Sequence, residues 1–351
     1  MEPIVKWYGG LEKQRDIVLQ LLPNHFENYY EPFLGGGTMY FAMAGKTCYV
    51  NDKCKELMSL YKMMDHREGS AAFTNYFGTM AAAWKKIEAH FLGVVEELEE
   101  LNERYRLGLY HDYRDFVSAV NKTVDRITYR NIFYRAIPDP TDFRMELRHC
   151  VVYEMLRMEK LTDLDDKDIR RNLLCSMRQA IYGFLMEAAN RESADEAIRA
   201  AGLAFILNYC SSEAPFKRDE WGQIRLPFGP REKANVSLAP QVKQLKSAEF
   251  EAHLDRTSFC CDDALVFLQR NKPKADDFIF LDPPDEVRKE AGEMDYSPIQ
   301  HKRLADYLIG KCPAQWMLLV QPNCSALPQY RKANMRISRM EETEKLIVRN
   351  Y

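Results

Sequence analysis

The clearest structural signal in the chain lies at residues 28–38, which have the sequence NYYEPFLGGGT. The aromatic residues within 28–33 favour a short strand, and the three glycines that follow allow a tight turn and a close approach of a ligand to the backbone. A helical pattern at 39–44, a second strand at 47–50 and a helix from Lys55 come next. This order predicts a βαβ unit with a glycine-rich first turn, although such glycines also occur in tight turns that bind no ligand.

The second strand of this unit ends at Asp52, where a carboxylate can accept hydrogen bonds from the hydroxyls of a ribose. Asp52 also suits the N-cap of the helix that begins near Lys55. Because Asp52 occurs together with the glycine turn, ribose binding is the favoured interpretation of this residue. Residues 45–47 resemble the end of a phosphate-binding P-loop, but that motif needs a glycine where this chain has Tyr40, which excludes a P-loop hydrolase.

A third signal is the sequence FLDPPD at residues 280–285. The apolar strand ends in Asp282, at the edge where α/β sheets bind ligands. Pro283 and Pro284 stiffen the backbone and carry no N–H, which leaves carbonyl oxygens as acceptors. A carboxylate beside a rigid carbonyl can accept the two hydrogens of an exocyclic amine. Holding both hydrogens aims the lone pair of the amine nitrogen at a methyl donor. On its own, the tripeptide Asp282-Pro283-Pro284 also fits a proline turn that ends a strand.

The domain organisation follows from the change in hydrophobic pattern along the 351 residues. Residues 62–202 carry amphipathic helical patterns, as at 84–105 and 169–189, whereas strands alternate with helices again from 203. We therefore predict an α/β domain formed by residues 1–61 and 203–351, with a mostly parallel sheet and a helical insertion between its two parts.

Composition excludes several classes of protein. The net charge of −3 gives no general attraction to nucleic acid, so a nucleic-acid face has to be a local patch. The nine cysteines form no C-x-x-C pair and are predicted to be reduced thiols, and the seven histidines show no metal-ligand spacing, so no metal site is predicted. The sequence has neither a signal peptide nor an apolar run near the roughly 18 residues of a membrane span, which predicts a cytoplasmic protein without a membrane partner.

Taken together, these motifs resemble those of the Dam-type family of adenine-specific DNA methyltransferases, which use S-adenosylmethionine as methyl donor. The resemblance is spread along nearly the whole chain, in family order. The similar segments are PIVKWYGG at 3–10, EPFLGGG at 31–37, ND at 51–52, LPFG at 226–229, CDD at 261–263, DPPD at 282–285 and LIVRNY at 346–351.

The resemblance implies a Rossmann-like methyltransferase domain, DNA as the partner and S-adenosylmethionine as the cofactor. The implied cofactor-binding residues are Lys6, Trp7, Gly9, Gly10, Pro32, Phe33, Gly35, Gly37, Asp52, Asp263 and Asp282. The implied catalytic residues are Asp282, Pro283, Pro284 and Asp285. The helical insertion takes the place of the target-recognition domain. Direct methyl transfer, without a metal or a covalent enzyme intermediate, follows extrusion of the adenine from the helix.

The class of cytosine carbon-5 methyltransferases is not supported. A cytosine carbon-5 enzyme needs a Pro-Cys nucleophile, whereas this chain has Cys312-Pro313.

Two positions depart from the family pattern. The aromatic residue after the two prolines is Asp285, and a family lysine is Leu11, with Lys13 nearby. Stacking of a base on an aromatic ring contributes ~1–3 kcal/mol, and a carboxylate supplies none of it; Tyr296 is an aromatic residue a short distance along the chain. Two alternatives therefore stay open: a degenerate relative that binds cofactor or DNA without turnover, and methylation of RNA or of another exocyclic amine.

Two basic patches are candidates for DNA contact. Arg126 and Arg130 share a helix face beside tyrosines, and Lys217 and Arg218 lie with Arg225 in a hairpin-like stretch. The alternative is a solvated surface on which these cations pair with neighbouring carboxylates.

Overall fold

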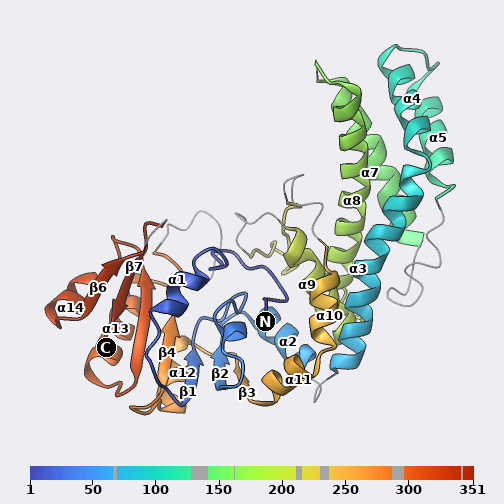
Figure 1. Cartoon of the computed structure of the whole chain (residues 1–351). Coiled ribbons are helices and arrows are strands. Elements are labelled where there is room, and N and C mark those ends of the chain that lie inside the picture. Colours follow the sequence, from blue (N-terminus) through green and yellow to red (C-terminus); the bar gives the residue numbers. More distant parts are fainter. Residues whose placement is uncertain are drawn as a thin grey trace. The chain divides into compact units, whose positions relative to one another are not determined.

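The computed structural model describes residues 1–65, 69–127, 141–161, 163–210, 216–229, 237–286, 296–340 and 343–351. The chain forms two compact units (Figure 1). The α/β unit consists of Met1–Glu68, Ser212–Arg218 and Lys243–Tyr351, and the helical unit of Gly69–Ser211 and Asp219–Val242.

A seven-stranded sheet with the order β3-β2-β1-β4-β5-β7-β6 forms the centre of the α/β unit. Pairing is parallel from β3 through to β5, and the last two strands are antiparallel, which confirms the mostly parallel sheet expected for a Rossmann-like fold. The strands are β1 (Asn28–Glu31), β2 (Thr47–Asn51), β3 (Thr257–Cys260), β4 (Phe278–Leu281), β5 (Gln315–Val320), β6 (Arg336–Arg339) and β7 (Leu346–Arg349).

The position of β1 explains where a ligand site can form. In Figure 1 the blue strands β1 and β2 lie beside the orange strands β3 and β4, because residues far apart in sequence pair. From β1 the chain continues to β2 on one side, whereas β4 and β5 extend the sheet on the other. The loops after β1 and β4 therefore diverge at a switch point, where open α/β sheets leave a crevice.

Alternation along the strands builds a hydrophobic layer on each face of the sheet. On one face, Ile279, Trp316 and Leu318 pack with α12 (Ala264–Asn271), α13 (Pro298–Gly310) and α14 (Leu327–Lys332). On the other face, aromatic residues of η1 (Tyr40–Ala42) contact α11 (Ala248–Asp255), and α2 (Lys55–Met64) lies against β3. The α/β unit is therefore a three-layer sandwich. A short helix, α1 (Arg15–Gln20), lies near its amino terminus.

The helical unit is built from long helices that pack pairwise, with α8 contacting both α7 and α9, and α3 contacting α9. Helix α9 approaches its neighbour closely, because a β-carbon at Gly202 would lie 3.0 Å from the Leu185 carbonyl oxygen. The helices are α3 (Ser70–Leu92), α4 (Val95–Arg106), α5 (Tyr113–Val124), α7 (Thr141–Glu159), α8 (Asp166–Asn190) and α9 (Glu196–Tyr209), and α10 (Ala239–Leu245) crosses into the α/β unit.

The observed unit boundaries differ from the predicted 62–202. Helix α2 continues to Met64 and keeps that segment in the α/β unit, whereas α9 runs unbroken to Tyr209 within the helical unit. Residues 219–242 also belong to the helical unit, where Tyr182 donates a hydrogen bond to the Leu226 carbonyl at 2.9 Å. A change of hydrophobic pattern could not reveal this return of the chain.

Three local predictions were wrong. The helix expected at 39–44 is a single 3-10 turn, Tyr40–Ala42, and Gly45 follows it with a φ of +84°. The helix expected at 84–105 is interrupted at Gly93, and the edge strand β6 was missed because its residues are mostly exposed and polar. All nine cysteines are free thiols, and none of the described helices is long and apolar enough to cross a bilayer.

Candidate functional site

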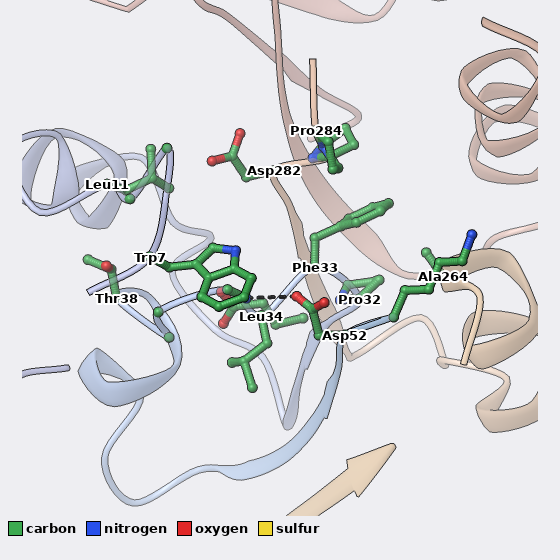
Figure 2. A pocket seen from close by; sticks show the side chains of 18 of the residues that line it. Trp7, Leu11, Pro32, Phe33, Leu34, Thr38, Asp52, Ala264, Asp282 and Pro284 are labelled. Carbon is green, nitrogen blue, oxygen red and sulfur yellow. Dashed lines mark hydrogen bonds between the residues drawn. The ribbon is translucent and has the colours of Figure 1, made fainter. Parts of the chain in front are cut away.

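A cavity of about 430 Å³ lies at the carboxyl edge of the sheet, within the α/β unit (Figure 2). It is lined by the amino-terminal segment and by the loops after β1, β2, β3 and β4. Except for Lys6, every predicted cofactor-binding residue lines it: Trp7, Gly9, Gly10, Pro32, Phe33, Gly35, Gly37, Asp52, Asp263 and Asp282. Pro283, Pro284 and Asp285 line the same cavity.

The glycine turn after β1 requires glycine for two reasons. Gly35 and Gly37 have φ values of +50° and +73°, which favour a residue without a β-carbon. A β-carbon at Gly35 would also lie 3.0 Å from Cδ1 of Trp7, and one at Gly37 would lie 2.9 Å from the Tyr61 hydroxyl. The Tyr61 hydroxyl donates a hydrogen bond to the Gly35 carbonyl at 3.0 Å. The turn is therefore held between Trp7 and Tyr61, with its backbone against the cavity.

Asp52 connects the end of β2 to this turn. Its Oδ2 accepts a hydrogen bond from the Gly35 amide at 3.0 Å, and its Oδ1 accepts one from the Cys54 amide at 2.9 Å. Burial raises the pKa of Asp52, and these amide hydrogen bonds oppose the shift. A carboxylate has about four acceptor positions, so each oxygen can also accept a ligand hydroxyl. Asp52 is not the N-cap of α2, because Cys54 occupies that position.

A neighbouring residue, Asn51, fixes the loops around Asp52. Asn51 is fully buried, and its Nδ2 donates to the carbonyl oxygens of Pro32 and Asp262, each at 3.0 Å. Its Oδ1 accepts the Asp262 amide at 2.9 Å. One amide side chain thereby ties together the loops that follow β1, β2 and β3.

Asp282 forms an ion pair that the sequence did not indicate. Its Oδ1 lies 2.7 Å from Nζ of Lys345, and both side chains are largely buried. Burial raises the pKa of Asp282, while Lys345 opposes this shift; burial lowers the pKa of Lys345, but attraction to Asp282 outweighs it and the net shift is upward. The pairing follows from topology. Strand β7 runs antiparallel to β5, which brings its amino-terminal end to the edge where β4 ends.

The carbonyl groups of the two prolines after Asp282 differ in their hydrogen bonding. The Pro284 carbonyl accepts a hydrogen bond from Nε2 of His301 at 3.2 Å, whereas the Pro283 carbonyl has no donor among the described residues. Only Pro283 therefore keeps the unengaged acceptor that the sequence predicted for both. Asp285 accepts a hydrogen bond from Nε2 of Gln321 at 3.1 Å.

Aromatic side chains also line the cavity. Tyr296 packs edge-on against Phe33, with ring centroids 5.0 Å apart, so an aromatic ring lies in the same cavity as Asp285. Phe216 stacks on Trp7 at 5.5 Å, a contact that the sequence did not indicate. Asp263 caps α12 through its Oδ1 while it also lines the cavity.

Three carboxylates around the cavity have pKa values shifted by their surroundings. The pKa values of Glu31, Asp52 and Asp282 are raised by burial, and all three side chains line this cavity. Glu31 accepts a hydrogen bond from the Tyr29 hydroxyl at 2.7 Å. Perturbed carboxylates that converge on one cavity are typical of a functional site.

Comparison with known families and proteins agrees with this geometry. The model of the D12 class N6 adenine-specific DNA methyltransferases matches residues 7–138, which include Trp7, the glycine turn and Asp52. Over these residues the chain is similar to this family of adenine DNA methyltransferases. The Type II methyltransferase M1.LlaDCHI of Lactococcus lactis subsp. cremoris is 33% identical over 64 residues, which are 18% of this chain and 22% of that relative. The matched segment thus spans less than a quarter of the relative's length.

The described cations predicted to contact DNA, Arg126, Lys217, Arg218 and Arg225, are not among the residues that line the cavity. Arg126 pairs with Glu97, and Arg218 with Glu56. Arg225 lies 2.9 Å from an oxygen of Asp219 and 3.5 Å from one of Glu187. Lys217 is partly buried, and Arg130 lies outside the described residues. These pairs match the charge pairing that the sequence left open as the alternative to DNA contact.

Proposed function

We propose that the chain transfers a methyl group from S-adenosylmethionine to the exocyclic amine of adenine in DNA. One observation carries the proposal: a single cavity joins the glycine turn and Asp52 to the Asp282-Pro283-Pro284 turn. A cofactor site and an amine-binding turn thus face the same space, as methyl transfer requires.

The residues on one side of the cavity fit the cofactor. The volume of about 430 Å³ lies within the range of small-molecule sites. Glycines 35 and 37 let a ligand approach the backbone, and Asp52 has acceptor positions for ribose hydroxyls. Trp7 and Phe33 offer apolar surface for a nucleoside or a thioether. When bound, S-adenosylmethionine supplies an electrophilic methyl group.

The residues on the other side fit the amine. Asp282 has one oxygen on Lys345 and a second oxygen for one amine hydrogen, while the Pro283 carbonyl can accept the other. Two acceptors on one nitrogen orient its lone pair away from them, toward the cofactor side. Lys345 favours the charged form of Asp282, and Asp282 is the acceptor that this chain offers for the proton released on methylation.

We assign recognition of DNA to the helical unit and to Lys217, Arg218 and Arg225. Arg126, Arg218 and Arg225 are half-exposed, so each can exchange a carboxylate partner for a phosphate at small cost. The target base has to leave the helix, because its amine is not reachable within the duplex.

The test is incubation of the purified chain with labelled S-adenosylmethionine and separate duplex DNA and RNA substrates, followed by nucleoside analysis. We expect label in N6-methyladenine from DNA. Label in RNA alone, or in another base, would contradict the proposed substrate. An Asp52→Asn variant removes the negative charge proposed to accept the ribose hydroxyls and leaves the Asp282-Pro283-Pro284 turn unchanged. It should bind the cofactor more weakly.

A second candidate is a relative that binds the cofactor without turnover. Two features of the Asp282-Pro283-Pro284 turn favour it. Lys345 occupies one oxygen of Asp282, and Asp285 lies where the family has an aromatic ring. Tight binding of labelled cofactor by calorimetry, with no label in any nucleic acid, would support this candidate. Activity that appears only in Asp285→Tyr would support it further.

A further inference from the structure

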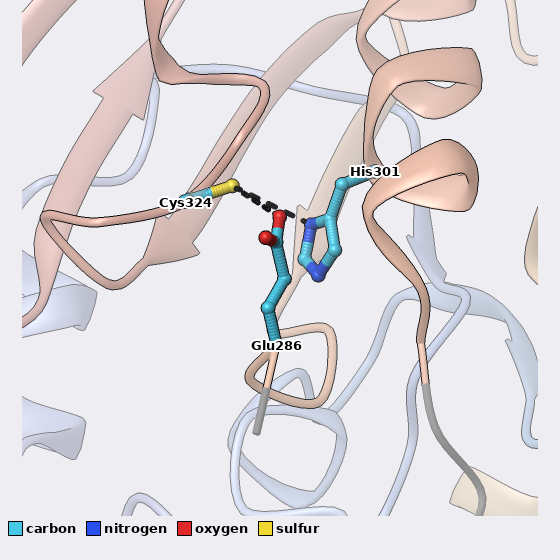
Figure 3. A group of neighbouring side chains, drawn as sticks. All are labelled: Glu286, His301 and Cys324. Carbon is cyan, nitrogen blue, oxygen red and sulfur yellow. Dashed lines mark hydrogen bonds between the residues drawn. The ribbon is translucent and has the colours of Figure 1, made fainter. Parts of the chain in front are cut away.

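Three side chains with metal-binding atoms meet directly behind the Asp282-Pro283-Pro284 turn (Figure 3). Glu286 follows that turn, His301 lies in α13, and Cys324 follows β5. One ligand atom from each lies within 4.8 Å of the others. The figure shows the carboxylate, the imidazole and the thiol pointing toward one another.

The spacing of these atoms fits a tetrahedral ion. Sγ of Cys324 lies 3.6 Å from Nδ1 of His301 and 3.5 Å from Oε1 of Glu286. Bonds of about 2.0–2.3 Å from Zn²⁺ to oxygen, nitrogen and sulfur place neighbouring ligand atoms roughly 3.3–3.6 Å apart. Little movement is needed to admit an ion.

Neighbouring residues orient two of the three groups. Nε2 of His301 lies 3.2 Å from the Pro284 carbonyl, which can only accept, so the ring proton is on Nε2 and the Nδ1 lone pair points toward Cys324. The Ser325 amide and hydroxyl donate to Oε1 of Glu286 at 2.9 and 2.7 Å, which fixes the carboxylate and leaves Oε2, without a hydrogen bond among the described residues, as its ligand atom. Such outer hydrogen bonds are usual for the histidine and carboxylate ligands of metals.

Burial distinguishes this cluster from ordinary surface groups. Cys324 and His301 are 6% and 4% exposed, and Glu286 is partly buried. By contrast, the other comparable group among the described residues, His111, Asp112 and Asp115, is exposed, and Asp112 already caps α5.

We propose that Glu286, His301 and Cys324 bind one Zn²⁺, with water as the fourth ligand. A thiolate, an imidazole and a carboxylate form a ligand set typical of zinc, and binding releases the thiol proton to solvent. Because His301 also holds the Pro284 carbonyl, the ion stiffens the turn that carries Asp282. The spacing of histidines along the sequence predicted no such site, since the three residues are separated by 15 and 23 positions.

The first test measures zinc content. The full chain is treated with a chelator, desalted, equilibrated with Zn²⁺ alone, passed through a desalting column and analysed by atomic spectrometry. We expect one zinc per chain in the unchanged protein and in Cys312→Ser, the matched thiol control in the same unit, and loss of zinc in Cys324→Ser. In Glu286→Gln, which keeps the acceptor for Ser325, the affinity should fall by at least about tenfold.

The second test identifies the ligand atoms. With Co²⁺ in place of Zn²⁺, the unchanged chain and Cys312→Ser should show a thiolate-to-cobalt charge-transfer band that Cys324→Ser lacks. Circular dichroism checks the fold, and Glu286→Gln keeps the test valid if Cys324→Ser unfolds. Equal zinc retention by the unchanged chain and both site variants, or cobalt binding without the thiolate band, overturns the proposal. These readouts do not involve methyl transfer, so this proposal and the proposed function can fail separately.

Discussion

The two units of the chain use charged side chains in different ways. In the α/β unit, Glu31, Asp52 and Asp282 line one cavity, and their pKa values are raised by burial. In the helical unit, charges lie at the surface in pairs such as Arg126–Glu97 and Arg170–Glu99. Removing one partner of a buried pair costs about 3–5 kcal/mol, whereas an exposed pair contributes roughly 0–1 kcal/mol. Single substitutions should therefore have large effects in the α/β unit and small ones in the helical unit.

The largest effect is expected for Asp282→Asn. Loss of the charged acceptor should lower methyl transfer by roughly 10²–10³-fold, comparable to loss of one group that stabilises a transition state. It also leaves the Lys345 charge buried without a partner, which should lower the free energy of unfolding by about 3–5 kcal/mol. Nucleoside analysis and urea denaturation measure the two effects.

The double variant Asp282→Asn with Lys345→Met is the matched control. It removes both charges, so it should regain most of the stability without regaining activity. If it recovers methyl transfer, Asp282 does not hold the amine.

The next largest effect is a pH dependence that originates in the α/β unit. His253 lies against the Tyr40 ring, and burial lowers its pKa from 6.5 to about 4. Below pH 6.5 the unfolded chain takes up a proton that the folded chain does not, so this contribution to stability is lost as the pH falls from 6.5 to 4. The loss amounts to about 3 kcal/mol.

Denaturation of the parent chain and of His253→Phe at pH 7 and pH 4.5 measures this contribution. The parent should lose more stability than the variant between the two pH values. An equal loss in both would show that His253 does not cause the dependence.

A smaller gain is expected for Asp285→Tyr. An aromatic ring at this position can stack on the target base, which contributes ~1–3 kcal/mol and corresponds to tighter DNA binding or faster transfer by roughly 5- to 150-fold. An Asp285→Leu variant removes the charge without adding a ring and separates the two causes. An increase of the same size in Asp285→Leu would assign the effect to charge.

The smallest effects are expected in the helical unit. Arg126→Gln should change the free energy of unfolding by less than about 1 kcal/mol, because the pair with Glu97 is exposed. If Arg126 contacts a phosphate, the same variant should weaken DNA binding and lower the slope of log affinity against log salt by about 1. Glu97→Gln, which releases Arg126, should not weaken binding. Equal salt slopes in both variants and the parent would remove Arg126 from the interface.

Much of the α/β unit was predictable because its signals are local. The apolar strand predicted before Asp282 is β4, which ends at Leu281, and the glycine turn and Asp52 lie together as expected. In the helical unit, amphipathic patterns predicted long helices but missed the interruption at Gly93. Helical periodicity continues across such a break, so the pattern alone does not reveal it.

The sequence by itself determined the class of sheet, the turn that needs glycine and the acidic residues at the strand ends, because each depends on neighbouring residues. Only the tertiary structure decided which side chains meet. Lys345 reaches Asp282 because β7 runs antiparallel, and Glu286, His301 and Cys324 converge from three separate elements. Contacts of this kind arise from strand order and helix packing, which no local pattern of residues encodes.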